Sequence, residues 1–293
     1  MVSTEAFNEH RPLLFSLAYR MLGSVADAED VVQEAFLRWH RATENSEEQA
    51  IRSPRSYLCT VVTRLCIDQL RSARVRREVY VGPWLPEPLV EHDTPDPTEE
   101  LELADSLSMA FLVLLESLSP EERAVFLLRQ VFDYDYAEIA RIVNKSEANC
   151  RQMVRRAQQH LAERRPRFNA TPEQREQMTH TFMQTCTNGD MEGLLSLLTQ
   201  DIVLYSDGGG KAKAATRPVY GADNVARFIF GVLSKVPPGF SAGVATVNGQ
   251  PGIVCYVEGE PFTVLSLDVA DGLIQGIYTV VNPDKLQHIP RME

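Results

Sequence analysis

The chain has 293 residues, of which 44% are hydrophobic and 24% charged, and its formal net charge at pH 7 is −11. This is the composition of an ordinary globular protein with room for about two or three domains. No apolar run reaches the roughly 18 residues that a membrane span needs, and the first residues lack the basic and apolar stretches of a signal peptide.

The five cysteines, at positions 59, 66, 150, 186 and 255, are scattered and form no metal-type CxxC pair. With no signal peptide in the sequence, this pattern favours reduced cysteines in a cytoplasmic protein. We expect neither a cofactor nor a metal ion.

Residues 5–78 are predicted to be helical almost throughout. Ser24 and Asp27 resemble a capping box that starts a helix running to about Arg41. Its buried stripe is predicted to be Val31, Val32, Ala35, Phe36 and Trp39. The first half of the helix is acidic and polar, which also suits the helix dipole and so has a purely structural explanation. Four of these polar residues are candidate contacts for a partner: Asp27, Asp30, Gln33 and Glu34.

A second long helix is predicted to start at Ser53-Pro54, with an N-cap followed by proline in the first turn. Leu58, Val61, Val62, Leu65 and Leu70 are expected to face inward. Residues 52–77 contain seven arginines and one acid, so 7 − 1 gives a local charge of +6. The candidate DNA contacts on this helix are Arg64, Arg71, Arg74, Arg76 and Arg77.

Residues 81–100 hold five prolines and six acids, which predicts an extended linker rather than a helix. Within it, WLPEP at 84–88 combines aromatic and aliphatic side chains. We expect this segment, through Trp84, Leu85 and Pro86, to dock on another part of the protein.

Residues 101–165 return to a helical pattern. A helix over 105–117 is expected to bury Leu107, Ala110, Phe111, Leu114 and Leu115, and Ser119-Pro120 starts the next one.

The segment 136–161 predicts two helices joined by a tight turn. Asn144 tolerates the left-handed backbone that such a turn needs, and Ser146 can cap the second helix. Ile139, Val143, Cys150, Met153 and Val154 are spaced to hold the helices together. Arg151, Gln152, Arg155 and Arg156 share the opposite face, where arginine and glutamine suit guanine and adenine edges. This pattern is typical of a helix-turn-helix, although a solvated basic face would look similar.

Residues 141–167 contain eight basic and two acidic side chains, so this segment carries 8 − 2 = +6 in a chain of −11. The acidic remainder disfavours indiscriminate binding to phosphates. We therefore expect a partner protein to bring the chain to DNA.

From Pro166 onward, the sequence pattern changes from helical to mixed helix and strand. Helices are predicted at 172–188, 191–199 and 221–236, and strands at 202–206, 252–258, 262–269 and 273–281. This predicts an α+β domain with a curved sheet wrapped by helices. The polar candidates for lining its pocket are His180, Tyr205, Asp207, Lys211, Arg217 and Tyr278.

These features together resemble the extracytoplasmic-function sigma factors of RNA polymerase, in the SigJ-like group with a fused C-terminal SnoaL-like domain. The resemblance rests on the helices at 27–41, 53–77 and 117–157 and on WLPEP (84–88), DGGGK (207–211) and NPDKL (282–286). It implies two all-α sigma domains, the second a helix-turn-helix, and an NTF2-like cone-shaped domain. The implied ranges are 1–80 for sigma region 2, 81–104 for the linker, 105–166 for sigma region 4 and 167–293 for a regulatory domain.

The resemblance also implies roles for the candidate residues. Asp27, Asp30, Gln33 and Glu34 would face the β′ clamp of the polymerase core. The arginines of the 53–77 helix would contact the minus-ten element, and those of the helix-turn-helix would contact the minus-35 element. The linker, DGGGK (Asp207, Gly208, Gly209, Gly210, Lys211) and NPDKL (Asn282, Pro283, Asp284, Lys285, Leu286) would form an interdomain regulatory contact. A monomeric free protein is expected, and the C-terminal pocket is left open as a site for a small ligand.

One position departs from the family pattern. Many such sigma factors have an Arg-Asn pair where Thr63-Arg64 stands here, and Tyr57 is the one aromatic residue of that helix that could stack on an unpaired base. The residue that captures a flipped base is therefore left open.

Two other functions compete with the sigma-factor hypothesis: a stand-alone DNA-binding repressor that senses a ligand, and an enzyme with a helical accessory region. A repressor has no need of the acidic helix at 27–41. An enzyme would need an acid or base held in a dry pocket, and the sequence shows no paired carboxylates that compel one. The DGGGK loop lacks the spacing of a phosphate-binding loop, and its glycines favour a close backbone approach instead.

Overall fold

The computed structural model describes residues 2–44, 51, 53–77, 80–91, 106–162 and 170–292. Two compact units divide the chain: Met1–Glu78 with Leu114–Arg164, and Val79–Val113 with Arg165–Glu293. We call them the helical unit and the C-terminal unit. The segment that precedes the last helices of the helical unit thus belongs to the C-terminal unit.

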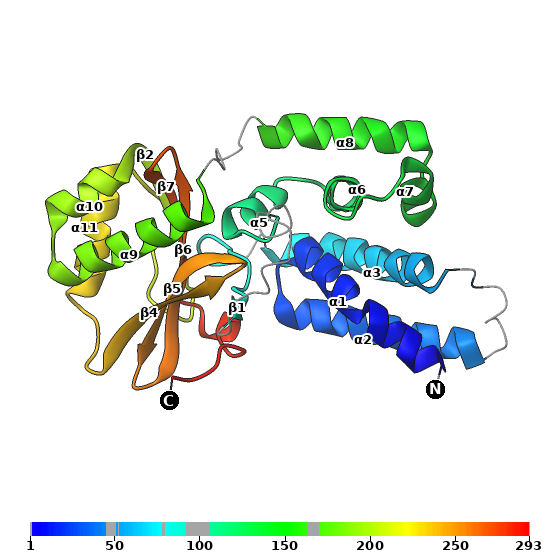
Figure 1. The fold of residues 1–293 in the computed structure, drawn as a ribbon, viewed down its shortest axis with the longest axis horizontal. Coiled ribbons are helices and arrows are strands. Elements are labelled where there is room, and N and C mark those ends of the chain that lie inside the picture. Colours follow the sequence, from blue (N-terminus) through cyan, green and yellow to red (C-terminus); the bar gives the residue numbers. More distant parts are fainter. Residues whose placement is uncertain are drawn as a thin grey trace. The chain divides into compact units, whose positions relative to one another are not determined.

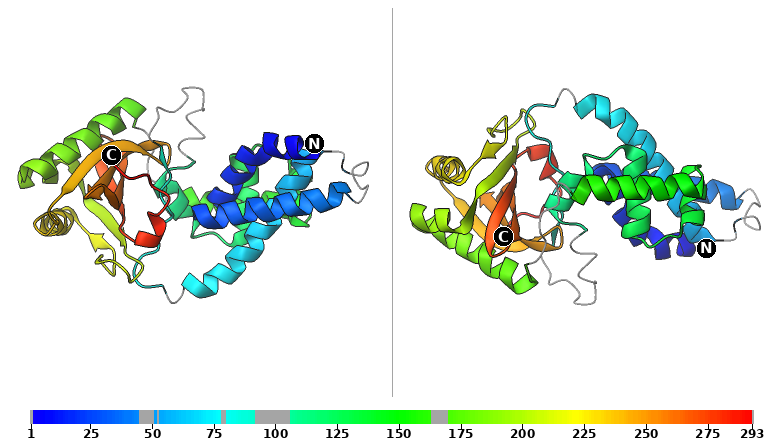
Figure 2. Two further views of the ribbon diagram at one scale, coloured as in Figure 1. Left: turned by 90° about the horizontal axis from the view of Figure 1, so that it is seen from below. Right: turned by 90° about the horizontal axis from the view of Figure 1, so that it is seen from above.

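The helical unit is built from helices alone within its described residues (Figure 1). They are α1 (Val2–Leu22), α2 (Val25–Glu44), α3 (Pro54–Arg77), α6 (Pro120–Gln130), α7 (Tyr136–Val143) and α8 (Glu147–Ala162), with α5 (Met109–Leu115) crossing the boundary between the units. Helices α1, α2 and α3 pack on one another, and α3 also packs on α6 and α7 (Figure 2).

Side-chain caps set the helix starts that the sequence predicts. Ser24 Oγ accepts a hydrogen bond from the Asp27 amide at 3.2 Å, and Ser53 Oγ accepts one from the Ser56 amide at 3.2 Å. Ser119 forms a full capping box with Glu122 at the start of α6. Each cap satisfies an amide that the first helical turn leaves without an intrahelical partner.

The C-terminal unit contains one seven-stranded sheet in the order β1-β4-β5-β6-β7-β2-β3. Its strands are β1 (Val90–Glu91), β2 (Leu198–Asp207), β3 (Val219–Tyr220), β4 (Phe240–Val247), β5 (Gln250–Val257), β6 (Glu260–Ala270) and β7 (Leu273–Val280). Neighbouring strands are antiparallel except β2 and β7, which are parallel. Helices α9 (Pro172–Asn188), α10 (Met191–Leu197) and α11 (Ala222–Leu233) cover one face (Figure 1).

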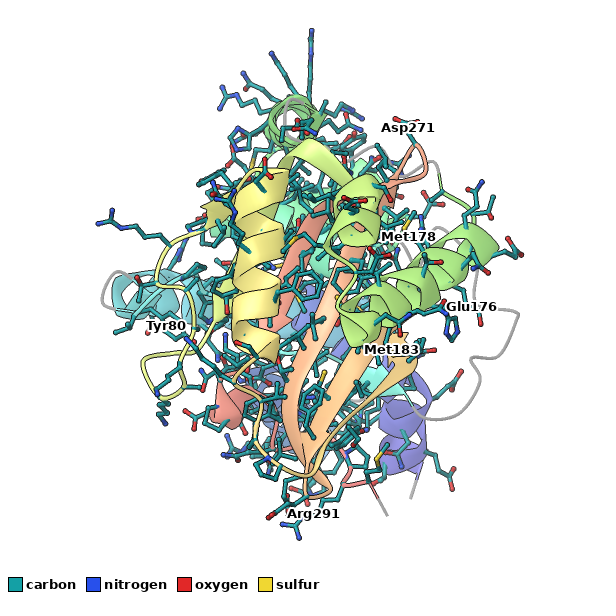
Figure 3. The ribbon with its side chains drawn as sticks, turned by 90° about the vertical axis from the view of Figure 1, so that its left-hand side faces the viewer. Tyr80, Glu176, Met178, Met183, Asp271 and Arg291 are labelled. Carbon is teal, nitrogen blue, oxygen red and sulfur yellow. The ribbon has the colours of Figure 1, made fainter. Side chains whose placement is uncertain are left out.

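The alternation of side chains along each strand gives this sheet two cores. Ile253 and Cys255 on β5 join the core under α9, α10 and α11, where Met178 and Met183 of α9 also pack (Figure 3). Val254 and Tyr256, on the other side of the same strand, join a second core. That second core is closed by segments from elsewhere in the chain: Leu85, Met109, Ala110, Leu286 and Ile289.

The predicted fold class, two all-α parts followed by an α+β domain, is confirmed. The helix predicted over 105–117 is shorter in the structure, where α5 covers Met109–Leu115. Strand β4 was missed because FSAGVATV is rich in small residues and its side chains are mostly half-buried, so it lacks the strong alternation of its neighbours. No helix within the described ranges is long and apolar enough to cross a membrane.

Candidate nucleic-acid interface and linker-binding site

Helix α2 exposes a polar strip beside its buried face. Of the predicted apolar stripe, Val31, Val32, Ala35 and Trp39 are buried and Phe36 is half-buried. Asp30 and Gln33 are exposed, and Asp27 and Glu34 are half-exposed, with Glu34 paired to Arg38 at 2.8 Å. Leu37, with 40% of its surface exposed, adds an apolar side chain to this helix surface.

Two of the candidate arginines on α3 are bound to helices α6 and α7 of the helical unit. Arg64 donates from Nε to the carbonyl of Ile142 at 3.0 Å and from Nη2 to that of Arg141 at 3.2 Å. These carbonyls belong to the last turn of α7, where a positive charge also suits the helix dipole. Arg71 pairs with Glu121 of α6 at 2.5 Å.

These contacts border a hollow of about 220 Å³ that is lined by both sets of helices, including Asp68, Val143 and Lys145. The backbone of α3 extends to Arg77, but the side chains of Arg74, Arg76 and Arg77 lie outside the described residues. Thr63 is fully buried, so it faces the core of the unit, and Tyr57 packs against Trp39 with ring centroids 5.8 Å apart.

The helix-turn-helix has the geometry that its sequence predicts. Asn144 ends α7 in the left-handed region, with φ 53° and ψ 53°, and Ser146 Oγ accepts from the Asn149 amide at 3.3 Å. Ile139, Cys150, Met153 and Val154 are buried between the helices. Ile142 is buried there too, whereas the predicted Val143 is half-buried. An Asp135–Glu138 capping box, which the sequence reading missed, starts α7.

All four candidate DNA contacts on α8 are exposed: Arg151, Gln152, Arg155 and Arg156. Arg151 pairs with Glu147 at 2.9 Å, and its guanidinium lies 4.9 Å from the centre of the Tyr136 ring. Helix α8 therefore offers a row of solvent-facing donors that fits the edges of bases in a major groove.

The C-terminal unit binds the WLPEP segment through a buried carboxylate. Asp207, at the end of β2, is fully buried. Its Oδ1 accepts from the Tyr80 hydroxyl at 2.6 Å, and its Oδ2 accepts from the Leu85 amide and from Lys285 Nζ, both at 2.8 Å. Burial, followed by the bond to Asp207, raises the pKa of Tyr80, so its hydroxyl stays a donor.

Lys285 completes this site. Its ammonium also donates to the Leu85 carbonyl at 2.5 Å and lies 4.2 Å from the centre of the Trp84 ring. Leu85 is 1% exposed. Further along, the Leu89 amide donates to Asn248 at 3.2 Å, and β1 adds Val90 and Glu91 to the edge of the sheet beside β4. The segment 80–91 is thus a built-in part of the C-terminal unit.

The DGGGK glycines make this docking possible. A side chain at Gly209 would come within 2.3 Å of Asn282 Nδ2 and 2.9 Å of the Tyr80 hydroxyl, and Gly209 has φ +57°. Gly210, with φ +73°, approaches Val81. Gly208 faces the carbonyl of Ala212, and the exposed Lys211 pairs with Asp284 at 2.5 Å. The backbone at Gly209 and Gly210 therefore passes close to the start of the linker.

The NPDKL residues form the other wall. Asn282 donates to the Tyr80 hydroxyl at 2.9 Å and caps a short 3-10 helix over Pro283–Lys285, while Leu286 joins the second core of the sheet.

The six polar side chains predicted to line a pocket lie in different places in the C-terminal unit. A water-sized cavity of about 10 Å³ lies on the second face of the sheet, and of the six polar candidates Tyr278 lines it. Tyr205 stacks on Tyr278 with centroids 5.5 Å apart. Asp207 holds the linker instead, while His180 and Lys211 are exposed and Arg217 lies outside this lining.

Sequence reasoning missed the polar groups of this cavity, Ser266 and Asp268. Both lie on β6, facing Tyr278 and Gly276 of β7 in the sheet register. Asp268 accepts from Gln275 Nε2 at 3.1 Å, and its burial raises the pKa to about 6 despite that bond and nearby Arg175. Ser and Asp two residues apart in a strand is the signal that was available. Among the described residues, no three His, Cys, Asp or Glu side chains form a group that could hold a metal ion.

Comparison with known proteins places these features in one family. Residues 6–76 match the model for sigma-70 region 2, and residues 108–161 match that for sigma-70 region 4. The chain is 38% identical to the ECF RNA polymerase sigma factor SigJ of Mycobacterium tuberculosis, over 99% of this chain and 94% of that protein. It is 34% identical to the probable ECF sigma factor SigI of the same organism, over 96% of this chain and 93% of that one.

The fold agrees with these matches. The crystal structure of M. tuberculosis SigJ superposes with a TM-score of 0.77 at 35% identity, covering 97% of this chain and 98% of that one. The chain therefore belongs to the extracytoplasmic-function sigma factors of RNA polymerase, which are transcription initiation factors and not enzymes.

Proposed function

We propose that this sigma factor binds polymerase and promoter DNA through three separate surfaces. The polar strip of α2 binds the clamp of the polymerase β′ subunit. The arginines of α3 contact the minus-ten element, and Arg151, Gln152, Arg155 and Arg156 of α8 read the minus-35 element. The C-terminal unit regulates these contacts by holding the linker, and the free protein is a monomer.

One observation carries the DNA part of this proposal: Arg151, Gln152, Arg155 and Arg156 are exposed together on the second helix of a capped helix-turn-helix. Phosphate contacts position such a helix, whereas contacts to base edges make it specific. A chain of net charge −11 gains little from non-specific attraction to DNA, so polymerase must supply much of the affinity.

The regulatory part rests on the linker site. Tyr80, Leu85 and Leu89 are each hydrogen-bonded to side chains of the C-terminal unit. Because residues 80–91 connect the two sigma regions in sequence, their release or capture changes how far the regions can separate. The domain ranges 1–80, 81–104, 105–166 and 167–293 remain our functional division of the chain, although the described residues 80–91 and 106–113 belong to the C-terminal unit.

Run-off transcription with core polymerase and the full chain tests the promoter part. We expect the double change Arg155→Ala and Arg156→Ala to abolish the dependence of transcription on the minus-35 sequence. The control is Arg227→Ala/Lys235→Ala, which removes two exposed positive charges from the C-terminal unit. Unchanged minus-35 dependence in the double variant would contradict the proposal.

Core binding is tested separately by pull-down of polymerase core with the variant Asp30→Ala/Gln33→Ala. We expect reduced core binding, while Asp223→Ala/Gln184→Ala, which changes two exposed residues of the C-terminal unit, should leave it unchanged. Truncation of the chain at residue 166 would be a poorer test, because it removes the sheet that buries Leu85 and Met109.

A further inference from the structure

The second face of the C-terminal sheet carries a small group of polar side chains inside an apolar core. Ser266 is 9% exposed and Asp268 is 6% exposed. In the sheet register Ser266 lies opposite Tyr278, and Asp268 lies opposite Gly276. A side chain at Gly276 would lie 3.3 Å from both Asp268 Cβ and the Tyr278 hydroxyl, so the glycine leaves room for the carboxylate and the phenol to face each other.

One of these groups has no partner. Ser266 Oγ is buried and makes no hydrogen bond to the described residues. A buried hydroxyl without a partner costs about 1–3 kcal/mol, so such groups usually serve a bound molecule or water. Ser266 lines the cavity, and the remaining space of about 10 Å³ is close to the room that one water needs.

The cavity is small because the chain itself fills it. Ser108, Met109 and Ala110 line it and are 3%, 2% and 5% exposed. Met109 and Ala110 belong to the same apolar core as Val254, Tyr256 and Tyr278. These residues open helix α5, and they are also the first residues that match sigma region 4.

The Met109 side chain, which fills the space over Ser266 and Asp268, is of a kind that a bound molecule can displace. This unbranched side chain adapts to irregular space and forms no hydrogen bond with the polar floor beneath it. Met109 therefore covers Ser266 and Asp268 without satisfying them.

We propose that Ser266, Asp268 and Tyr278 form a binding site for a compact apolar molecule that carries a hydrogen-bond donor, such as a phenol, an alcohol or an amine, and that this molecule competes with Met109 for the site. The hydrogen-bonding floor selects a donor because Asp268 and Ser266 offer acceptor oxygens. A carboxylate ligand is excluded, since it would bring a second negative charge beside Asp268.

Occupation by such a molecule frees the first turn of region 4 from the C-terminal unit. This consequence rests on the proposed regulatory function, whereas the binding site does not. A titration of the protein alone, without polymerase or DNA, tests the site independently.

The direct test uses phenol, benzene and benzoate as probes, with the full chain labelled at its methionine methyl groups for NMR. The variant Met109→Leu assigns the Met109 signal. In the unchanged protein we expect phenol to move the Met109 signal toward its solvent-exposed position as Met109 leaves the Tyr256 and Tyr278 rings. A Met109 signal that stays in place at saturating phenol would overturn the competition.

The variant Met109→Ala removes the competitor, so phenol should bind at least about tenfold more tightly than to the unchanged protein. Benzene should bind this variant at least about tenfold more weakly than phenol, because it leaves the polar floor unpaired. Benzoate should not bind. In Met109→Ala/Asp268→Leu the preference for phenol over benzene should disappear.

The matched control is Met183→Ala, which opens space in the other core of the sheet, under α9 (Figure 3). It should bind phenol and benzene alike. Equal binding of the two probes to Met109→Ala, or binding of benzoate, would overturn the assignment of the polar floor.

Discussion

Two ion pairs, one in each unit of the chain, differ in how far they are buried. In the C-terminal unit, the side chains of Lys285 and Asp207 are 8% and 0% exposed and bond to each other. In the helical unit, those of Arg71 and Glu121 are 59% and 25% exposed. Breaking a buried pair leaves a charge with neither water nor partner, whereas an exposed pair is worth about 0–1 kcal/mol.

The buried and the exposed pairs therefore suit different roles. The buried charges of the C-terminal unit fix one arrangement of the linker, because each alternative arrangement leaves them unsatisfied. The exposed arginines of the helical unit exchange partners at little cost, which a surface that binds DNA or polymerase requires.

The strongest test of the buried side is Asp207→Ala. It leaves Lys285 buried without its carboxylate, so the C-terminal unit should lose about 3–5 kcal/mol in its free energy of unfolding. The amide of Leu85 should also exchange its hydrogen faster, since it loses its acceptor. Chemical denaturation and hydrogen exchange measure these effects.

The matched control is Asp284→Ala, which breaks the ion pair between Asp284 and Lys211. This pair is exposed: the side chain of Lys211 is 57% exposed and that of Asp284 is 50% exposed. It should cost less than about 1 kcal/mol. Similar losses in the two variants would remove the contrast between buried and exposed charge.

Asp268 tests the effect of a buried charge in the opposite direction, because its ionisation lowers the stability of the folded protein. Its folded pKa of about 6 lies above the usual 3.8, so its contribution to stability is complete below pH 3.8 and is lost as the pH rises to about 6. The cost above pH 6 is at most about 3 kcal/mol, from 1.36 kcal/mol per pKa unit.

Asp268→Asn cannot ionise, so this variant should be more stable than the unchanged protein at pH 7.5, and the advantage should vanish near pH 4. Urea denaturation at the two pH values measures this. An advantage of the same size at both would show that the ionisation of Asp268 is not its cause.

The sequence predicts local features of this protein better than its tertiary contacts. The helix-turn-helix follows from short spacings, because Asn144, Ser146 and the apolar stripe act within one or two helical turns. The resemblance to known sigma factors indicated the linker site, since WLPEP, DGGGK and NPDKL are local motifs.

The contacts of Arg64, and the position of Ser266 and Asp268 beneath Met109, could be found only from the three-dimensional structure. Arg64 donates hydrogen bonds to the carbonyls of Arg141 and Ile142, which lie 77 and 78 positions later in the chain. Asp268 faces Gly276 only because β6 and β7 pair in one register, with a shift between Asp268 and Val269. A pairing one residue out would turn these side chains to the other face.

On the exposed side, Arg155→Ala should weaken binding of the holoenzyme to a minus-35 promoter by about 1–3 kcal/mol and relax its preference at one base position. Arg155 is exposed on α8 and is available to a base edge. Binding measured across single-base promoter variants checks this. A uniform loss over all variants would indicate a phosphate contact instead.

The smallest expected effect comes from Glu121→Gln. If Arg71 contacts DNA as we propose, Glu121 competes with DNA for it, and removing the carboxylate should strengthen promoter binding by up to about 1 kcal/mol, or roughly fivefold. Glu176→Gln on α9 makes the same change in net charge and controls for it. The decisive comparison adds Arg71→Ala: if Arg71 is the group that Glu121 restrains, the gain from Glu121→Gln must vanish in the double variant. A gain that persists without Arg71 would assign the effect to long-range charge, and the exposed pair would then have no part in controlling access to α3.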